Sequence, residues 1–181
     1  MLQITVPPTE FFDESKQEFI TVKETKLQLE HSLLSLSKWE SKWHKPFMSD
    51  KPKTSEETID YIRCMTITQN VDPMVFVAIA HRKDLMKQIM DYMDDSMTAT
   101  WFTEQEGQGR RRNKKVITAE IIYYWMISAN VPFECEKWHL QRLFTLLRVC
   151  DEKSKPPKKM GKKARADWQR NLNAQRLAQR H

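Results

Sequence analysis

Residues 117–150 read ITAEIIYYWMISANVPFECEKWHLQRLFTLLRVC, and this stretch decides the fold that the sequence predicts. Apolar residues lie on most sides of the helix expected over 119–130, which is typical of a central, buried helix. Pro132 is expected to open a second helix, which carries leucines and aromatic residues. A short turn at 130–132 joins the two segments, so we expect an αα-hairpin that forms the core.

Amphipathic segments before this hairpin predict further helices. Leucines and tryptophans recur every three or four residues from about Leu27 to Trp43, and Pro46 ends the pattern. Thr54 and Glu57 have the spacing of a capping box, which would begin the next helix.

Two further capping residues and one further amphipathic helix are predicted after this. Asp72 before Pro73 predicts a cap followed by a short helix to Ala80. The apolar residues of 85–93 continue on another amphipathic helix. Thr118 is expected to cap the helix that begins the αα-hairpin.

The N-terminus has the alternating pattern of β structure. Leu2–Val6 and Glu18–Val22 are rich in β-branched and aromatic residues, so we expect them to pair as a hairpin. The predicted fold is therefore mainly α: a helical bundle body with a small N-terminal β-hairpin and a basic C-terminal extension. The expected boundaries are a β element at 1–26, a helical body at 27–152 and a basic tail at 153–181.

The charge is distributed unevenly along the chain. Residues 153–181 hold ten Lys and Arg and one acidic residue, a net charge of +9, and the whole chain is +6. Residues 1–152 therefore carry 6 − 9 = −3. A basic tail on a mildly acidic body indicates a partner with an acidic or phosphate-bearing surface.

Composition excludes several classes of protein. Three glycines are too few for a phosphate-cradling loop or a doubly wound nucleotide fold. Three widely spaced cysteines and an N-terminus without a signal pattern favour reduced thiols in a cytosolic protein. No run approaches the roughly 20 apolar residues that cross a bilayer, so no membrane partner is expected.

No motif predicts an active site. Cys135 and His139 have the spacing of metal ligands on one helix face, but a structural zinc needs about four ligands and no second pair is present. His31 and His44 lie near several serines, none of which has the sequence of a nucleophile elbow. We therefore expect no catalytic residue, no cofactor and no metal, and a protein that is not an enzyme.

Two basic regions could contact nucleic acid. Trp39 and Trp43, interleaved with lysines, resemble a patch that stacks on bases, although their four-residue spacing favours packing in the core or at an interface. The basic run at 110–115 and the tail at 153–181 are better candidates. The alternative for both is a solvated, disordered extension.

Five segments resemble one known family. They are WESKWHKPF at 39–47, MTATWF at 97–102, ITAEIIYYW at 117–125, PFECEKWHL at 132–140 and NLNAQR at 171–176. Together they resemble the tail assembly chaperones of siphophages, the tailed bacteriophages with long, non-contractile tails. The resemblance spans nearly the whole chain.

The resemblance implies a role in building the phage tail. Such proteins bind the helical tape measure protein and help tail tube subunits polymerise around it, and some of their genes yield a longer product by ribosomal frameshifting. The implied partners are the tape measure and tail tube proteins. We also expect self-association, and the charge of the basic tail makes nucleic acid a possible partner. The implied location is the cytoplasm of the infected host, or the virion. The family supplies no catalytic residues.

Combining the resemblance with the residue patterns gives a set of expected partner-binding residues. They are Trp39, Trp43, Trp101, Phe102, Arg110, Arg111, Arg112, Lys158, Lys159, Lys162, Lys163, Arg165, Trp168 and Leu172. Two other functions stay open: a structural virion component, such as a head–tail or tail-completion adaptor, and a small nucleic-acid-binding regulator.

Overall fold

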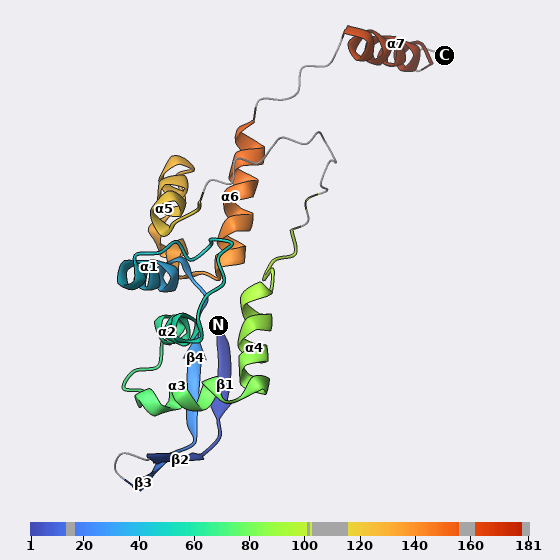
Figure 1. Cartoon of the computed structure of the whole chain (residues 1–181). Helices are drawn as coiled ribbons and strands as arrows, with labels where there is room; N and C mark the ends of the chain where they lie inside the picture. Colours follow the sequence, from blue (N-terminus) through green and yellow to red (C-terminus); the bar gives the residue numbers. More distant parts are fainter. Residues whose placement is uncertain (14–16, 101, 103–115, 156–161, 179–181) are drawn as a thin grey trace. The chain divides into compact units, whose positions relative to one another are not determined.

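The computed structural model describes residues 1–13, 17–100, 102, 116–155 and 162–178 (Figure 1). The chain divides into two units, Met1–Cys150 and Asp151–His181. The described residues are mainly helical, as the sequence predicts, with a small β element at the N-terminus.

Four short strands form the β element: β1 (Leu2–Val6), β2 (Thr9–Asp13), β3 (Glu18–Val22) and β4 (Thr25–Leu29). β1 pairs antiparallel with β4, and β2 pairs antiparallel with β3. The β element is thus present, but the expected pairing of β1 with β3 is wrong. The prolines between β1 and β2 have no N–H to donate to a ladder, so they separate the two strand pairs.

β4 also corrects the expected start of the first helix. Leu27 and Leu29 were predicted to be helical, but they lie in β4 and are fully buried on one face of the ribbon. Lys26 and Gln28 alternate with them and are exposed. The alternation of buried and exposed residues covers too few positions to be recognised beside the apolar residues that follow, which recur every three or four positions.

The next two helices begin at side-chain caps. α1 (Leu33–Trp43) starts after Ser32, whose hydroxyl accepts from the Ser35 N–H, and ends at His44 in the left-handed conformation. α2 (Ser55–Met65) has the capping box predicted for Thr54 and Glu57, with both reciprocal hydrogen bonds formed.

α3 (Pro73–Ala80) and α4 (Lys83–Asp94) follow. The predicted cap of α3 is confirmed, because the Asp72 carboxylate accepts from the Met74 N–H at 2.9 Å. Both helices contact β1, and α3 also contacts β3. They therefore cover the apolar side of the ribbon that carries Ile4 and Val6.

The predicted αα-hairpin differs most from the structure. α5 (Ala119–Ser128) is followed by a 3-10 turn, η1 (Phe133–Lys137), and then by α6 (Leu140–Ser154), so Pro132 begins η1 rather than α6. α5 buries only one side, while Tyr124 and Ile127 on the other are 65% and 59% exposed. It is therefore not a central helix. The helix that packs against α2, α5 and η1 is α1.

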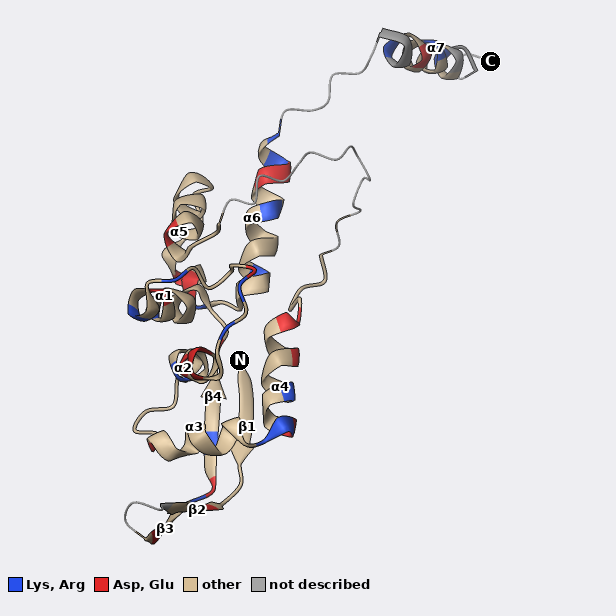
Figure 2. Cartoon of the chain, viewed as in Figure 1, with Lys and Arg blue, Asp and Glu red and all other residues tan. Residues whose placement is uncertain are grey.

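The second unit contains the end of α6 and α7 (Lys162–Ala178). Lys155 forms ion pairs with Asp151 and Glu152, at 2.8 and 2.9 Å. On α7 an Arg170–Asp167 pair at 2.7 Å is exposed, and Figure 2 shows basic residues along this helix. Among the described residues, no helix is both long enough and apolar enough to span a membrane.

One carboxylate joins three parts of the first unit. Glu40, on α1, is 8% exposed. One of its oxygens accepts from the Phe47 N–H at 2.7 Å, and the other accepts from the Ala119 N–H at 2.7 Å. Glu40 thereby replaces Thr118 as the side-chain cap of α5, since Thr118 makes no capping hydrogen bond. An acidic group at this end also suits the helix dipole.

Replacing Glu40 by glutamine should destabilise the first unit. Glutamine has one acceptor oxygen, so its NH₂ group would face the second backbone donor. We expect Glu40→Gln to lower the free energy of unfolding by about 2–4 kcal/mol, because a buried donor is left unsatisfied and a strong hydrogen bond is lost. Urea unfolding followed by circular dichroism measures this change.

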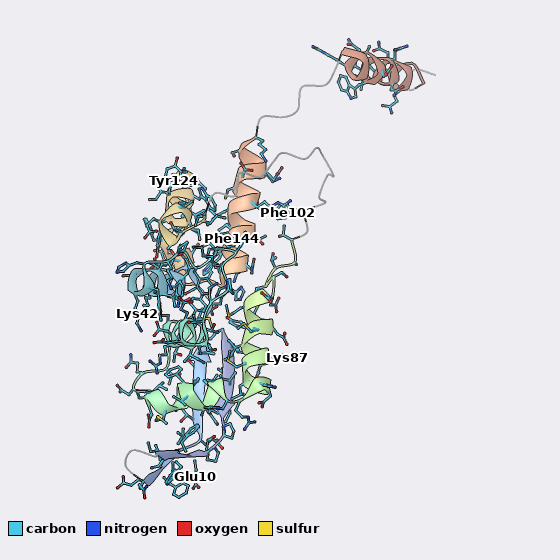
Figure 3. All side chains as sticks on the ribbon, in the orientation of Figure 1. Glu10, Lys42, Lys87, Phe102, Tyr124 and Phe144 are labelled. Atoms are coloured by element: carbon cyan, nitrogen blue, oxygen red, sulfur yellow. The ribbon has the colours of Figure 1, made fainter. Side chains whose placement is uncertain are left out.

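The matched control is Glu10→Gln on β2. Glu10 is exposed (Figure 3), so its substitution should change stability by less than about 0.5 kcal/mol. Equal effects of the two substitutions would show that Glu40 is not a structural cap.

Candidate partner-binding surface

Trp39 is a core residue rather than a contact residue. It is 1% exposed, and its indole Nε1 donates to the backbone carbonyl of Glu57 at 2.9 Å. Its ring lies 5.1 Å from that of Phe47 and stacks on Trp43 at 6.1 Å. A partner could not reach this ring, which corrects its assignment as a partner-binding residue. The four-residue spacing correctly favoured packing.

Trp43 and two lysines beside it also make contacts with α2. Trp43 is half-buried, and its Nε1 donates to Asp60 at 2.9 Å. Lys42 pairs with the same carboxylate, and Lys45 pairs with Glu57 at 2.5 Å. The hydrogen bond from Lys45 lowers the pKa of Glu57. Lys42 and Lys45 are thus paired with α2, while their side chains stay 59% exposed, and this cluster is an α1–α2 interface.

The remaining predicted contact residues are spread over the chain. Phe102 is half-buried beneath the Arg148 guanidinium of α6, 4.0 Å from the ring centroid. Arg165 and Trp168 are exposed on α7, where Leu172 is half-buried four residues after Trp168. Lys162 and Lys163 lie in the first turn of α7. The predicted contacts outside the described residues are Trp101, Arg110, Arg111, Arg112, Lys158 and Lys159.

Cys135 and His139 do not share the helix face that their four-residue spacing indicated. Cys135 belongs to η1, whereas His139 follows it just before α6, so they do not share a helix face. Within the described part of the chain, no cluster of three or more His, Cys, Asp or Glu could hold a metal ion. Burial raises the pKa of the Cys135 thiol, which disfavours the thiolate.

Two open cavities on the first unit are lined entirely by described residues. The larger, about 550 Å³, lies over the β1–β4 ribbon and is lined by Gln3, Ile4, Thr5, Lys26, Leu27, Gln28 and Thr68. The smaller, about 410 Å³, is lined by Glu40, Ser41, His44, Lys45, Pro46, Thr118 and Glu120. In the smaller cavity, Glu40 already accepts hydrogen bonds from the Phe47 and Ala119 amides. Lys45 is already paired with Glu57. Neither cavity presents a nucleophile paired with a base.

The sequence did not predict a buried polar cluster built around two histidines. The His31 Nδ1 lies 2.6 Å from the Tyr61 hydroxyl, and the His31 ring meets the His139 ring edge-on at 5.2 Å. His139 Nε2 lies 3.0 Å from the Tyr92 carbonyl oxygen. The two histidines are only 4% and 5% exposed, so a substrate cannot reach them. The cluster joins α2 and α4 to the segment between β4 and α1 and to the residue just before α6.

Both histidines favour the neutral form. Burial, together with the neighbouring His139 ring, lowers the pKa of His31 from 6.5 to about 3. Burial also lowers the pKa of His139, against the opposing effect of Glu30 and Asp95. The unfolded chain therefore binds more protons than the folded chain below about pH 6.5, and stability falls as the pH falls through this range.

We expect the first unit to be sensitive to mild acid. Between pH 7 and 5, keeping His31 neutral removes about 2 kcal/mol from the free energy of unfolding, and His139 acts in the same direction. His31→Gln should therefore reduce the pH dependence, whatever its effect on stability at pH 7. Urea unfolding at a series of pH values measures the slope.

The control is His44→Asn, which removes an exposed histidine and suits the left-handed conformation at φ 52°. This variant should keep the wild-type slope. If the pH dependence of the free energy of unfolding is unchanged in His31→Gln, buried His31 is not a source of the acid sensitivity.

The structure reveals one contiguous apolar surface that the sequence had placed in the core. It consists of Tyr123, Tyr124 and Ile127 on α5 with Phe133 of η1, and we call it the α5–η1 face. Tyr124, Ile127 and Phe133 are 65%, 59% and 56% exposed. The Phe133 ring lies 6.3 Å from that of Tyr123, which links the two elements. Sequence analysis missed it because an apolar run does not distinguish core from interface.

An exposed apolar pair also lies on the β2–β3 hairpin. Phe12 and Phe19 are 51% and 70% exposed, and their rings lie 5.1 Å apart across the two strands.

Comparisons of the chain with protein families, with curated proteins and with solved structures find no match.

Proposed function

We propose that this chain is a siphophage tail assembly chaperone that binds the tape measure protein, tail tube subunits, or both during tail morphogenesis. The observation that carries the proposal is the α5–η1 face, an apolar surface on a well-packed body. Contiguous exposed apolar residues are typical of surfaces that bind other proteins. The resemblance of five sequence segments to this family gives the identity of the clients.

The chemistry of the body supports a binding role over a catalytic one. Among the described polar groups that are buried, Glu40 and the two histidines form hydrogen bonds between different parts of the first unit. The tape measure is a long helical protein in this family. Helices bind to apolar surfaces through residues three and four positions apart, and α5 presents such a surface.

The basic tail supports reversible binding. α7 has Trp168 and Leu172 four residues apart, so the helix carries a narrow apolar stripe. It belongs to residues 153–181, whose net charge is +9. Contacts of this kind depend on ionic strength and release readily. A chaperone must leave its client when the tail tube closes around it.

Affinity capture during infection tests the proposal. The tagged full-length chain, expressed in infected host cells, should recover the tape measure protein and tail tube subunits at moderate salt. Mass spectrometry of the captured proteins identifies them. The control is capture from uninfected cells. Recovery of capsid proteins or DNA without either tail protein would contradict the proposal.

The composition of mature particles separates a chaperone from a structural virion component. A chaperone should be present in the lysate of infected cells and absent from purified particles. Mass spectrometry of both samples measures the copy number. A stoichiometric copy number in particles would instead favour a head–tail or tail-completion adaptor.

After the virion component, the charge of residues 153–181 supports a nucleic-acid-binding regulator as the third candidate. This function predicts DNA affinity that decreases steeply with salt, because each phosphate contact releases a counterion. Deletion of 153–181 would abolish it. Absence of DNA binding at low salt would exclude this candidate.

A further inference from the structure

We propose that the α5–η1 face binds a basic amphipathic helix of the client protein. This inference rests on the proposed function for the identity of the client, and on the structure for the surface and the chemistry of its partner. It places the main binding surface on the body of the protein.

The apolar part of the face is continuous. Tyr124 and Ile127 are three residues apart on α5, and Tyr123 is four residues before Ile127, so the three side chains are neighbours on one side of the helix. The ring of Phe133 extends this surface onto η1. Figure 3 labels Tyr124 on α5. A partner helix could bury these residues through leucines spaced by three and four.

Acidic side chains border the face. Glu120 is four residues before Tyr124 on α5, and Glu134 follows Phe133 directly; both are exposed. Glu136 accepts from the Tyr123 hydroxyl at 2.8 Å. Among residues 119–138, Lys137 is the only cation against three acids, which gives a net charge of −2. In Figure 2, α5 is uncharged beyond its first turn.

This arrangement favours a cationic partner. An acidic rim around an apolar centre attracts lysine and arginine and disfavours an acidic helix. Lys45 lines the smaller cavity together with Glu120, but it forms its ion pair with Glu57. Glu120 is therefore open to a cationic partner. Burial of the Tyr123 hydroxyl and its hydrogen bond to Glu136 raise its pKa to about 12, so this donor stays protonated.

A designed peptide tests the surface without requiring the natural client. The probe is an amphipathic Leu/Lys peptide of about 14 residues, or roughly four helical turns, and its counterpart replaces every Lys by Glu. In fluorescence anisotropy titrations the full-length chain should bind the Leu/Lys peptide through the α5–η1 face, whereas the Leu/Glu peptide should bind only the basic tail and be insensitive to substitutions on that face. Failure of the chain to bind the Leu/Lys peptide would overturn the proposal.

Two double variants locate the binding. Tyr124→Ser with Ile127→Ser should weaken binding of the Leu/Lys peptide by at least about tenfold, because central apolar residues dominate binding energy. The control, Phe12→Ser with Phe19→Ser, removes an equally exposed apolar pair elsewhere and should change binding less than twofold. Similar losses in both variants would overturn the proposal. All four substituted residues are exposed, and circular dichroism checks that the variants fold.

Charge reversal tests the acidic rim separately. Glu120→Lys with Glu134→Lys should weaken binding of the Leu/Lys peptide and strengthen binding of the Leu/Glu peptide. Unchanged preference would overturn the assignment of a cationic partner. Light scattering adds one further test: a dimer that dissociates in the Tyr124→Ser, Ile127→Ser variant would show that a second copy of the chain occupies the face.

Co-expression with the tape measure protein distinguishes the two proposals. If the wild type and the Tyr124→Ser, Ile127→Ser variant retain it equally, the function stands and the surface assignment is wrong. If the peptide experiments succeed and the wild type does not retain the tape measure protein, the surface stands and the proposed function is wrong.

Discussion

The first unit depends on the carboxylate of Glu40. Its two oxygens accept from the backbone N–H groups of Phe47 and Ala119, one seven and the other 79 residues along the chain. A single side chain therefore fixes both the loop that follows α1 and the start of α5. Because Glu40 is buried, loss of either partner would leave a polar group unsatisfied, which costs about 1–3 kcal/mol.

Trp39, next to Glu40 on α1, fixes the contact between α1 and α2. The Trp39 indole donates to the Glu57 carbonyl, while Phe47 stacks on Tyr61 with ring centroids 3.9 Å apart. The loop that follows α1 thus shares one aromatic cluster with α1 and α2. Adjacent positions on α1 hold α2 and α5, which explains why the core is centred on α1 rather than on the α5–α6 pair.

Sequence analysis predicted the features that local chemistry determines. The capping box at Thr54 and the cap at Asp72 need only residues two or three positions away, and both are present. Leu27 was misassigned because short apolar patterns fit a strand and a helix equally well. The contact between His31 and His139 joins residues far apart in the chain, and no local pattern predicts it.

The exposure of α5 has a physical explanation that also bears on function. Ala119, Ile122 and Met126 bury one side of the helix, and Glu40 caps its first turn. These contacts suffice to position α5, so folding does not require apolar side chains at Tyr124 and Ile127. Polar residues there would leave the core unchanged. Single exposed apolar residues are common on proteins, but a contiguous group with an acidic border is not accounted for by folding and is consistent with a binding surface.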